Sequence, residues 1–150
     1  MKKLVACTAS LCLLVPLFAY GTEMPVGSIK TVQGTATIIR NRTPIDTKAG
    51  TRVFPNDSLK TGADGSLSMI FRDDTRLSIG PDSEVAINEF LFSPAQGKLS
   101  FITRLLRGTA ACMTGIIGKL SPESVRFETP VANIGIRGTA FAVKVEDPGR

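Results

Sequence analysis

The sequence between Thr129 and Val145 reads Thr-Pro-Val-Ala-Asn-Ile-Gly-Ile-Arg-Gly-Thr-Ala-Phe-Ala-Val-Lys-Val. The Thr-Pro step is typical of a turn, and the two runs that follow are rich in residues that favour strands. The step Arg137-Gly138-Thr139 leads directly into the second run, where apolar and polar residues alternate. The stretch holds no arrangement of side chains typical of a catalytic site. It therefore predicts β-structure, with strands over residues 134–137 and 139–145 after an earlier strand over residues 125–128.

The same pattern of short alternating runs begins at Val26, and Gly, Pro, Asn and Asp separate the runs. It is clearest over residues 65–92. There the turn signals at Gly65, Asp74 and Asp82 lie 9 and 8 residues apart. This spacing is typical of a sandwich, a barrel or a solenoid. We therefore expect an all-β fold, a single domain of short strands in a curled or solenoid-like stack, with a β-sandwich as the alternative.

The segment that follows residue 96 has two interpretations. Leu99, Ile102 and Leu106 fit one face of a helix over residues 96–106, but strands over residues 99–103 and 105–113 fit the sequence equally well. We favour strands, because Gly108 and the flanking threonines would end a helix poorly and suit a bulge.

A Gly-Thr-Ala triplet occurs three times, beginning at Gly34, Gly108 and Gly138, and Arg precedes the last two copies. Glycine inside a strand costs stability, so it indicates a bulge, a sharp bend or the close approach of another backbone. The repeated triplet favours a repetitive β architecture. The alternative is that the three residues match by chance.

The amino terminus predicts export. Lys2 and Lys3 precede an apolar run over residues 4–20, and small residues at Ala19 and Gly21 are typical of a cleavage site. We expect a signal peptide over residues 1–21 and a periplasmic or secreted domain over residues 22–150. The alternatives are an uncleaved anchor or a lipoprotein processed at Cys7.

Cleavage would leave 16 Lys and Arg against 13 Asp and Glu, a net charge of +3. The basic residues are dispersed along the chain, which argues against a nucleic-acid partner. Cleavage would also leave Cys112 as the one cysteine, so we expect no intramolecular disulfide. The favoured interpretation of Cys112 is a small buried apolar residue. The alternative is a reactive thiol or an intermolecular bridge.

Enzymatic readings find little support. The sequence has no histidine, which removes Ser-His-Asp, Cys-His and histidine-metal chemistry. Asp73 and Asp74, with Asp64 or Asp82, could in principle bind calcium, but turn chemistry alone explains aspartates there. We therefore expect a protein that is not an enzyme and has no catalytic, metal or cofactor site.

Phe90, Leu91 and Phe92 stand in a row, and three bulky apolar residues cannot all face inward on one strand. The row indicates either a strand buried on both faces or an exposed patch that contacts a partner.

Four segments, residues 27–34, 50–62, 71–81 and 129–141, resemble the motifs of FecR-type periplasmic domains and occur in the same order. Residues 71–81 read Phe-Arg-Asp-Asp-Thr-Arg-Leu-Ser-Ile-Gly-Pro, which resembles that family's hairpin except that Asp74 replaces a glycine. A second departure is Asn56, which also stands in place of a glycine. The motif residues are Asp57, Thr61, Gly62, Asp73, Thr75, Gly80, Thr129, Pro130, Arg137, Gly138 and Thr139.

The resemblance implies an all-β periplasmic module. In its best-known members the module relays occupancy of an outer-membrane siderophore receptor to a cytoplasmic sigma factor. Only three residues precede the apolar segment and the chain stops soon after the last motif, so we expect neither a sigma-binding helix nor a receptor-contacting extension. The prediction is a non-enzymatic module that contacts an envelope protein, in envelope or iron-uptake signalling. The alternative is a module that binds envelope polysaccharide or a small ligand.

Overall fold

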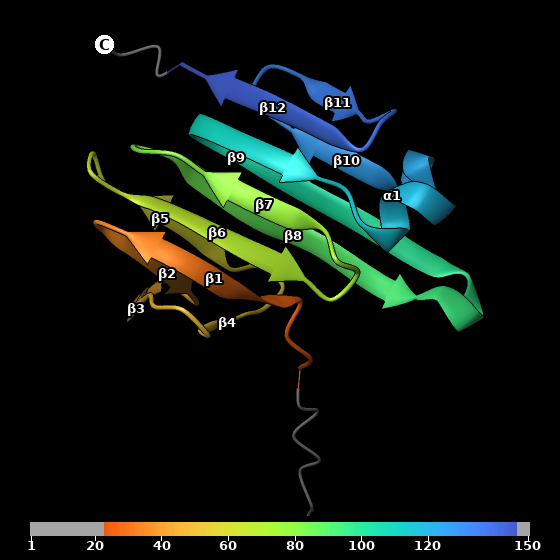
Figure 1. The fold of residues 1–150 in the computed structure, drawn as a ribbon, viewed down its shortest axis with the longest axis horizontal. Coiled ribbons are helices and arrows are strands. Elements are labelled where there is room, and N and C mark those ends of the chain that lie inside the picture. The colour runs from red at the N-terminus through yellow and green to blue at the C-terminus, as the bar shows by residue number, and fades with distance from the viewer. Residues whose placement is uncertain (1–22, 147–150) are drawn as a thin grey trace, which may run out of the picture.

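The computed structural model describes residues 23–146, which form twelve strands and three short helical segments (Figure 1). The predicted signal peptide lies outside the described residues. The strands are β1 (Gly27–Gln33), β2 (Ala36–Arg40), β3 (Thr43–Asp46), β4 (Arg52–Val53), β5 (Ser58–Thr61), β6 (Ser66–Phe71), β7 (Arg76–Ile79), β8 (Glu84–Ser93), β9 (Lys98–Met113), β10 (Val125–Glu128), β11 (Asn133–Gly135) and β12 (Ala140–Val145). The helical segments are η1 (Pro94–Gln96), α1 (Ile116–Leu120) and η2 (Pro122–Ser124).

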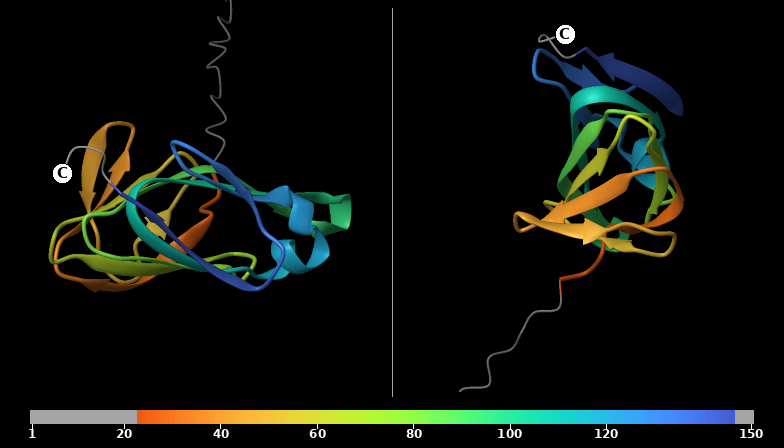
Figure 2. Two further views of the ribbon diagram at one scale, coloured as in Figure 1. Left: turned by 90° about the horizontal axis from the view of Figure 1, so that it is seen from above. Right: turned by 90° about the vertical axis from the view of Figure 1, so that its left-hand side faces the viewer.

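Strand β9 belongs to two sheets at once. Its amino-terminal half pairs with β8 and β10 in a sheet that runs β3-β2-β5-β8-β9-β10-β11, which we call sheet B. Its carboxy-terminal half pairs with β7 and β12 in a sheet that runs β4-β1-β6-β7-β9-β12, which we call sheet A. The combined sheet curls into an open half-barrel (Figure 2). The predicted all-β class and the predicted curl are therefore confirmed.

β9 is one strand of 16 residues where the sequence predicted two strands or a helix. Val85 pairs with Leu105 but Glu84 pairs with Arg107, so Leu106 is an extra residue, a β-bulge. Before the bulge the odd-numbered residues of β9 face the core, and after it the even-numbered residues, beginning with Ala110, do so. The bulge is thus where β9 passes from one sheet to the other.

The core lies between the two sheets and follows the alternation in the strands. Three phenylalanines meet in the core, with the Phe71 ring 5.3 Å from that of Phe90 and 4.9 Å from that of Phe101 between centroids. A second aromatic contact joins Phe127 of sheet B to Phe141 of sheet A, edge to face, at 5.2 Å. Aromatic contacts of this kind bury large areas of apolar surface and hold the two sheets together.

The three Gly-Thr-Ala glycines occupy different settings. Gly34 (φ +60°) lies in the turn between β1 and β2, Gly108 (φ +85°) lies inside β9 beside the bulge, and Gly138 (φ +143°) lies in the loop before β12. A Cβ on Gly108 would lie 2.6 Å from the Cα of Ser83, and one on Gly34 would lie 2.7 Å from the carbonyl carbon of Asp64, so the predicted close approach of another backbone occurs at both glycines. Gly34 and Gly138 do not interrupt a strand.

The connection from β9 to β10 was not predicted. It contains α1 and η2, and it turns the chain back so that β10 lies parallel to β9, in a sheet whose other pairings are antiparallel. β10 occupies the predicted residues 125–128. β11 ends at Gly135, two residues before the predicted strand end, because residues 136 and 137 have no strand partner. Within residues 23–146, no helix has the length and apolar character needed to span a membrane.

Candidate functional site

The turn between β6 and β7 holds one aspartate inside the protein and one outside. The Asp73 carboxylate is fully buried and accepts hydrogen bonds from the Thr75 amide (3.1 Å), the Thr75 hydroxyl (2.8 Å) and the amide of Ile117 in α1 (3.2 Å). Asp74 is exposed and has a φ of +64°. The interpretation of this pair as turn residues is therefore supported, and Asp73 in addition attaches α1 to the hairpin.

Asp57 is a second buried carboxylate. Arg40 donates to it through Nε (2.8 Å) and Nη2 (2.7 Å), and the amide of Phe54 donates a third hydrogen bond (2.8 Å). The Arg40 pKa is raised, chiefly by this hydrogen bond to Asp57. The guanidinium also lies 4.4 Å from the centroid of the Phe54 ring. This bidentate pair fixes β2 to the turn that precedes β5.

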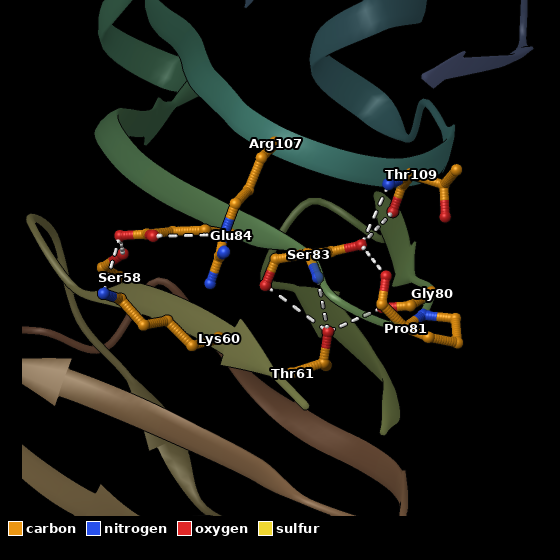
Figure 3. Close-up of polar contacts among 9 residues, drawn as sticks. All are labelled: Ser58, Lys60, Thr61, Gly80, Pro81, Ser83, Glu84, Arg107 and Thr109. Carbon is orange, nitrogen blue, oxygen red and sulfur yellow. Dashed lines mark hydrogen bonds and ion pairs between the residues drawn. The ribbon is translucent and has the colours of Figure 1, made fainter. Parts of the chain in front are cut away.

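A polar cluster holds the corner at which the chain passes from β7 in sheet A to β8 in sheet B (Figure 3). The Thr61 hydroxyl donates to the Gly80 carbonyl (2.6 Å) and accepts from the Ser83 amide (3.0 Å). The Ser83 hydroxyl accepts from the Thr109 amide (2.9 Å) and lies within donating distance of the carbonyls of Pro81 (2.9 Å) and Thr109 (3.2 Å). We call these residues the corner cluster: Thr61, Gly80, Pro81, Ser83 and Thr109.

Beside the corner cluster, Glu84 lies between two cations (Figure 3). Lys60 approaches it at 3.0 Å and Arg107 at 3.9 Å, and the Ser58 hydroxyl lies 3.5 Å away. Both cations are more than two-fifths exposed. Ion pairs at such exposed positions add little to stability, and these two link side chains of β5, β8 and β9.

The polar groups of these clusters bond to one another and to the backbone, an arrangement typical of a structural role. Ser83 has backbone groups and Thr61 as partners and no general base, and Asp57 and Asp73 have their oxygens occupied by donors. Residues 23–146 contain no group of three Cys, Asp or Glu side chains placed to hold a metal ion. The motif residues Asp57, Asp73 and Thr61 lie in three separate clusters, so the fold does not bring them into one site.

The stretch between Thr129 and Val145 builds a different feature, a pocket of about 570 Å³ that we call the C-terminal pocket. One wall is the turn after β10, in which the Thr129 hydroxyl accepts from the Ala132 amide (3.0 Å). The opposite wall is the end of β12, and the bulge of β9 places Leu106 beside it. The lining residues are Leu106, Arg107, Thr129, Pro130, Val131, Ala132, Ile134, Val143, Lys144, Val145 and Glu146.

Two apolar side chains of the C-terminal pocket are open to solvent. Val131 is 91% exposed and Leu106 is 36% exposed. Arg137, Gly138 and Thr139, three further motif residues, lie just before β12, and the carbonyls of Gly138 and Thr139 lie near the Thr114 hydroxyl (3.2 and 3.4 Å). The remaining motif residue, Gly62, donates from its amide to the Thr35 carbonyl (2.9 Å). The C-terminal pocket was not predicted, because it depends on the bulge at Leu106 and on the contact between distant strands.

The family model described as FecR protein matches residues 57–150. The chain belongs to the FecR family. The matched region contains Asp57, Asp73, the corner cluster and the C-terminal pocket, and the predicted resemblance is thus confirmed. No curated protein and no solved structure matches this FecR-family chain.

The row Phe90-Leu91-Phe92 does not form one exposed surface in this FecR-family chain. Ile87 pairs with Thr103 but Glu89 pairs with Ile102, so Asn88 is an extra residue in β8. This second bulge turns Phe90 into the core, where it is 5% exposed, and leaves Leu91 49% exposed. Phe92 is half-buried against the core. Leu91 is therefore the part of the predicted partner patch that is open to a partner.

Cys112 is buried in β9 and is 3% exposed. Burial, with a smaller contribution from the negative charge of Asp73, raises the pKa of its thiol from 9.0 to about 12. The thiol is therefore protonated at neutral pH and unreactive as a nucleophile. This agrees with the favoured interpretation of Cys112 as a buried apolar residue.

Proposed function

We propose that this FecR-family chain is a periplasmic module that acts by contact with another envelope protein and catalyses no reaction of its own. The family is linked to envelope and iron-uptake signalling, and the proposed role lies within that process. Residues 1–21 would direct export and would be removed on translocation, as the basic and apolar segments of the amino terminus indicate.

The observation that carries the proposal is the C-terminal pocket with Val131 and Leu106 beside it. An isolated exposed apolar side chain is ordinary, but apolar side chains that border a pocket are typical of contact sites. Arg107 and Lys144 at the rim supply the polar border that such sites usually have. The buried polar groups of the motif residues are satisfied within the chain, which supports a structural role for these residues and a function carried by the surface.

The proposal can be tested by capturing cross-linked partners of the tagged full chain from its native envelope. Val131→Asp should reduce the captured partner at least tenfold, because a charge at the rim of an apolar pocket opposes burial. Leu91→Asp is the matched control, since it places the same charge on an exposed apolar residue of β8 that does not line the C-terminal pocket. Far-ultraviolet spectra of both variants would establish that they are folded.

Equal capture by wild type and Val131→Asp would contradict the pocket as the contact site. Loss of capture in Leu91→Asp alone would move the contact site to the exposed part of the Phe90-Leu91-Phe92 row.

The alternative, binding of an envelope polysaccharide or small ligand, is favoured by a second pocket of about 1040 Å³ beside the β10–β11 hairpin. Arg126 and Arg137 line it, and neither forms an ion pair with another described residue. Unpaired guanidinium groups suit an acidic sugar. Saturable binding of alginate oligosaccharides that is lost in the Arg126→Ala/Arg137→Ala double variant would favour this role over protein contact.

A further inference from the structure

β12 is an edge strand. Among the described residues it pairs with β9 alone, and it lies at the end of sheet A opposite β4 (Figure 1). The amide of Thr114 donates to the carbonyl of Thr139 (2.8 Å), so the backbone of Thr139 points toward β9. Backbone groups of successive strand residues point to alternate sides. The N–H and C=O groups of Ala140, Ala142 and Lys144 therefore point away from β9, at the free edge.

The hydrogen bonds between β9 and β7 also indicate which backbone groups of β12 face the free edge. The amide of Gly80, next to β7, donates to the carbonyl of Thr109 (3.1 Å), so Thr109 and Ala111 point toward β7. Ala110 and Cys112 then point toward β12, where their register partners are Val143 and Phe141. The even-numbered residues of β12 therefore have backbone N–H and C=O groups that face no partner strand among the described residues.

The free edge is also sterically open. Ala140 and Ala142 carry only methyl groups, and both are exposed. Natural proteins commonly obstruct a sheet edge with a bulge, a proline or charges. Here β12 is regular over its six paired residues, and Lys144 is its single charged residue.

The C-terminal pocket lies where a strand beside β12 would place its side chains. The inner face of β12 presents Val143 and Val145 to the pocket, and Val131 of the β10–β11 turn and Ile134 of β11 form the other wall. Every second side chain of an added strand points to the inner face of the sheet. Apolar residues at alternate positions of the added strand would thus enter the pocket and cover Val131.

The charges near this edge define the partner further. Arg137 lies just before β12, and Lys144 lies at the pocket end of the strand beside Arg107, whose guanidinium is 3.9 Å from the Glu84 carboxylate. Glu146 is the single carboxylate among the pocket-lining residues, and its pairing with Lys144 (3.0 Å) joins two well-exposed side chains. The surroundings therefore favour a negatively charged segment.

We propose that β12 accepts an added strand from a partner protein, and that this strand is an extended acidic segment in which apolar residues alternate with polar ones. The inference rests on the proposed function and specifies how the contact is made. Main-chain hydrogen bonds to Ala140, Ala142 and Lys144 provide affinity, and the C-terminal pocket selects the alternate apolar residues.

The test uses the purified exported chain and a fluorescent synthetic peptide in which Val alternates with Thr and Glu, measured by fluorescence anisotropy. Two further peptides carry N-methyl groups on one or the other alternate set of amides. We expect saturable binding of the parent peptide. One methylated peptide should bind roughly tenfold or more weakly, because its methyl groups remove the donors that face β12, and the other should bind like the parent.

Variants of the chain provide an independent check. Ala142→Pro removes an amide that points to the free edge and spares the pairing with β9, so it should weaken binding by a similar factor. Lys144→Glu should also weaken binding of the acidic peptide, and the control Lys144→Arg should bind as the wild type does.

Equal binding of the two methylated peptides, or no saturable binding of any of them, would overturn strand addition. A concentration-dependent dimer of the chain that is lost in Ala142→Pro would assign the edge to a second copy and overturn it as well. Failure of the strand-addition hypothesis can be distinguished from failure of the proposed function. If Val131→Asp still abolishes partner capture while both methylated peptides bind alike, protein contact stands and strand addition falls.

Discussion

Asp73 and Asp74 are neighbours in the sequence with opposite effects on stability. Asp73→Asn should lower the free energy of unfolding by about 2–3 kcal/mol, because its amide group would face the donors Thr75 and Ile117.

Asp74→Gly should raise the free energy of unfolding by about 0.5–1 kcal/mol, because glycine adopts a φ of +64° without strain. Urea denaturation of the two variants measures both effects, and destabilisation by Asp74→Gly would contradict the assignment of strain to this residue.

Because of Cys112, the free energy of unfolding should fall as the pH rises into the alkaline range. Its thiol pKa, about 12 in the folded protein against 9.0 for a free thiol, means that the folded state holds the proton more tightly. This stabilisation is complete below pH 9 and is lost as the pH rises toward 12, by up to about 1.4 kcal/mol per pH unit. Urea denaturation at pH 8 and pH 10 should show the fall in wild type and a smaller one in Cys112→Ala. The described residues contain no tyrosine that would titrate in the same range.

At the residue scale the sequence predicts turns better than it predicts side-chain partners. The turn at Asp74 follows from local chemistry, and the structure has it there. The burial of Asp73 does not, because its partner Ile117 lies 44 residues away. Phe90 and Leu91 could not be assigned to opposite faces, because the bulge at Asn88 depends on the register with β9.

Among the elements, β9 depends most on one residue. Gly108 has a φ of +85°, and an added Cβ would overlap the Oγ of Ser83. Gly108→Ala should therefore destabilise the protein by at least about 3 kcal/mol, through backbone strain and a clash with the corner cluster. Gly138→Ala is the matched control. It has positive φ with nothing within 4 Å, so a loss of about 1–2 kcal/mol is expected.

Thermal denaturation of these two variants separates the two effects. Gly138→Ala introduces backbone strain alone, and Gly108→Ala introduces backbone strain and a clash with Ser83. Equal losses in melting temperature would show that the contact between Gly108 and Ser83 contributes nothing.

The elements differ in how well the sequence predicts them. β10 follows from its alternation and has the predicted bounds. β9 was divided in two because the pattern of buried residues shifts by one position at the bulge near Leu106, and a shift in period resembles a strand end. α1 was missed because it has five residues and no side-chain cap, so it carries too little periodicity to recognise.

For the whole molecule, the sharing of β9 predicts cooperative unfolding. Sheets A and B both hydrogen-bond to this one strand, so neither can separate while the other stays intact. Amides in β8 and β9 should exchange with solvent only through global unfolding, and those of β3, β4 and β11 at the edges should exchange faster. Hydrogen exchange followed by mass spectrometry measures this. Two well-separated protection levels for the sheet A and sheet B halves of β9 would contradict it.

The fold class and the family could be predicted from the whole sequence, and the contact surface could not. The C-terminal pocket joins a bulge at Leu106 with strand ends that lie about forty residues further along the chain. None of its residues is unusual alone, and in the sequence Val131 cannot be told from a valine that packs in the core. The exposure of Val131 acquires meaning only beside the free edge of β12.

The parallel pairing of β10 with β9 has a consequence for biosynthesis. Phe101 and Arg104 precede in the chain the residues of α1 that reverse its direction, so a chain that emerges from its amino terminus gains β10 at these positions only afterwards. Until then the flank of β9 is bare and able to pair with a neighbouring nascent chain. A protein truncated after Met113 should accumulate as insoluble material in cells, whereas the full-length chain should not.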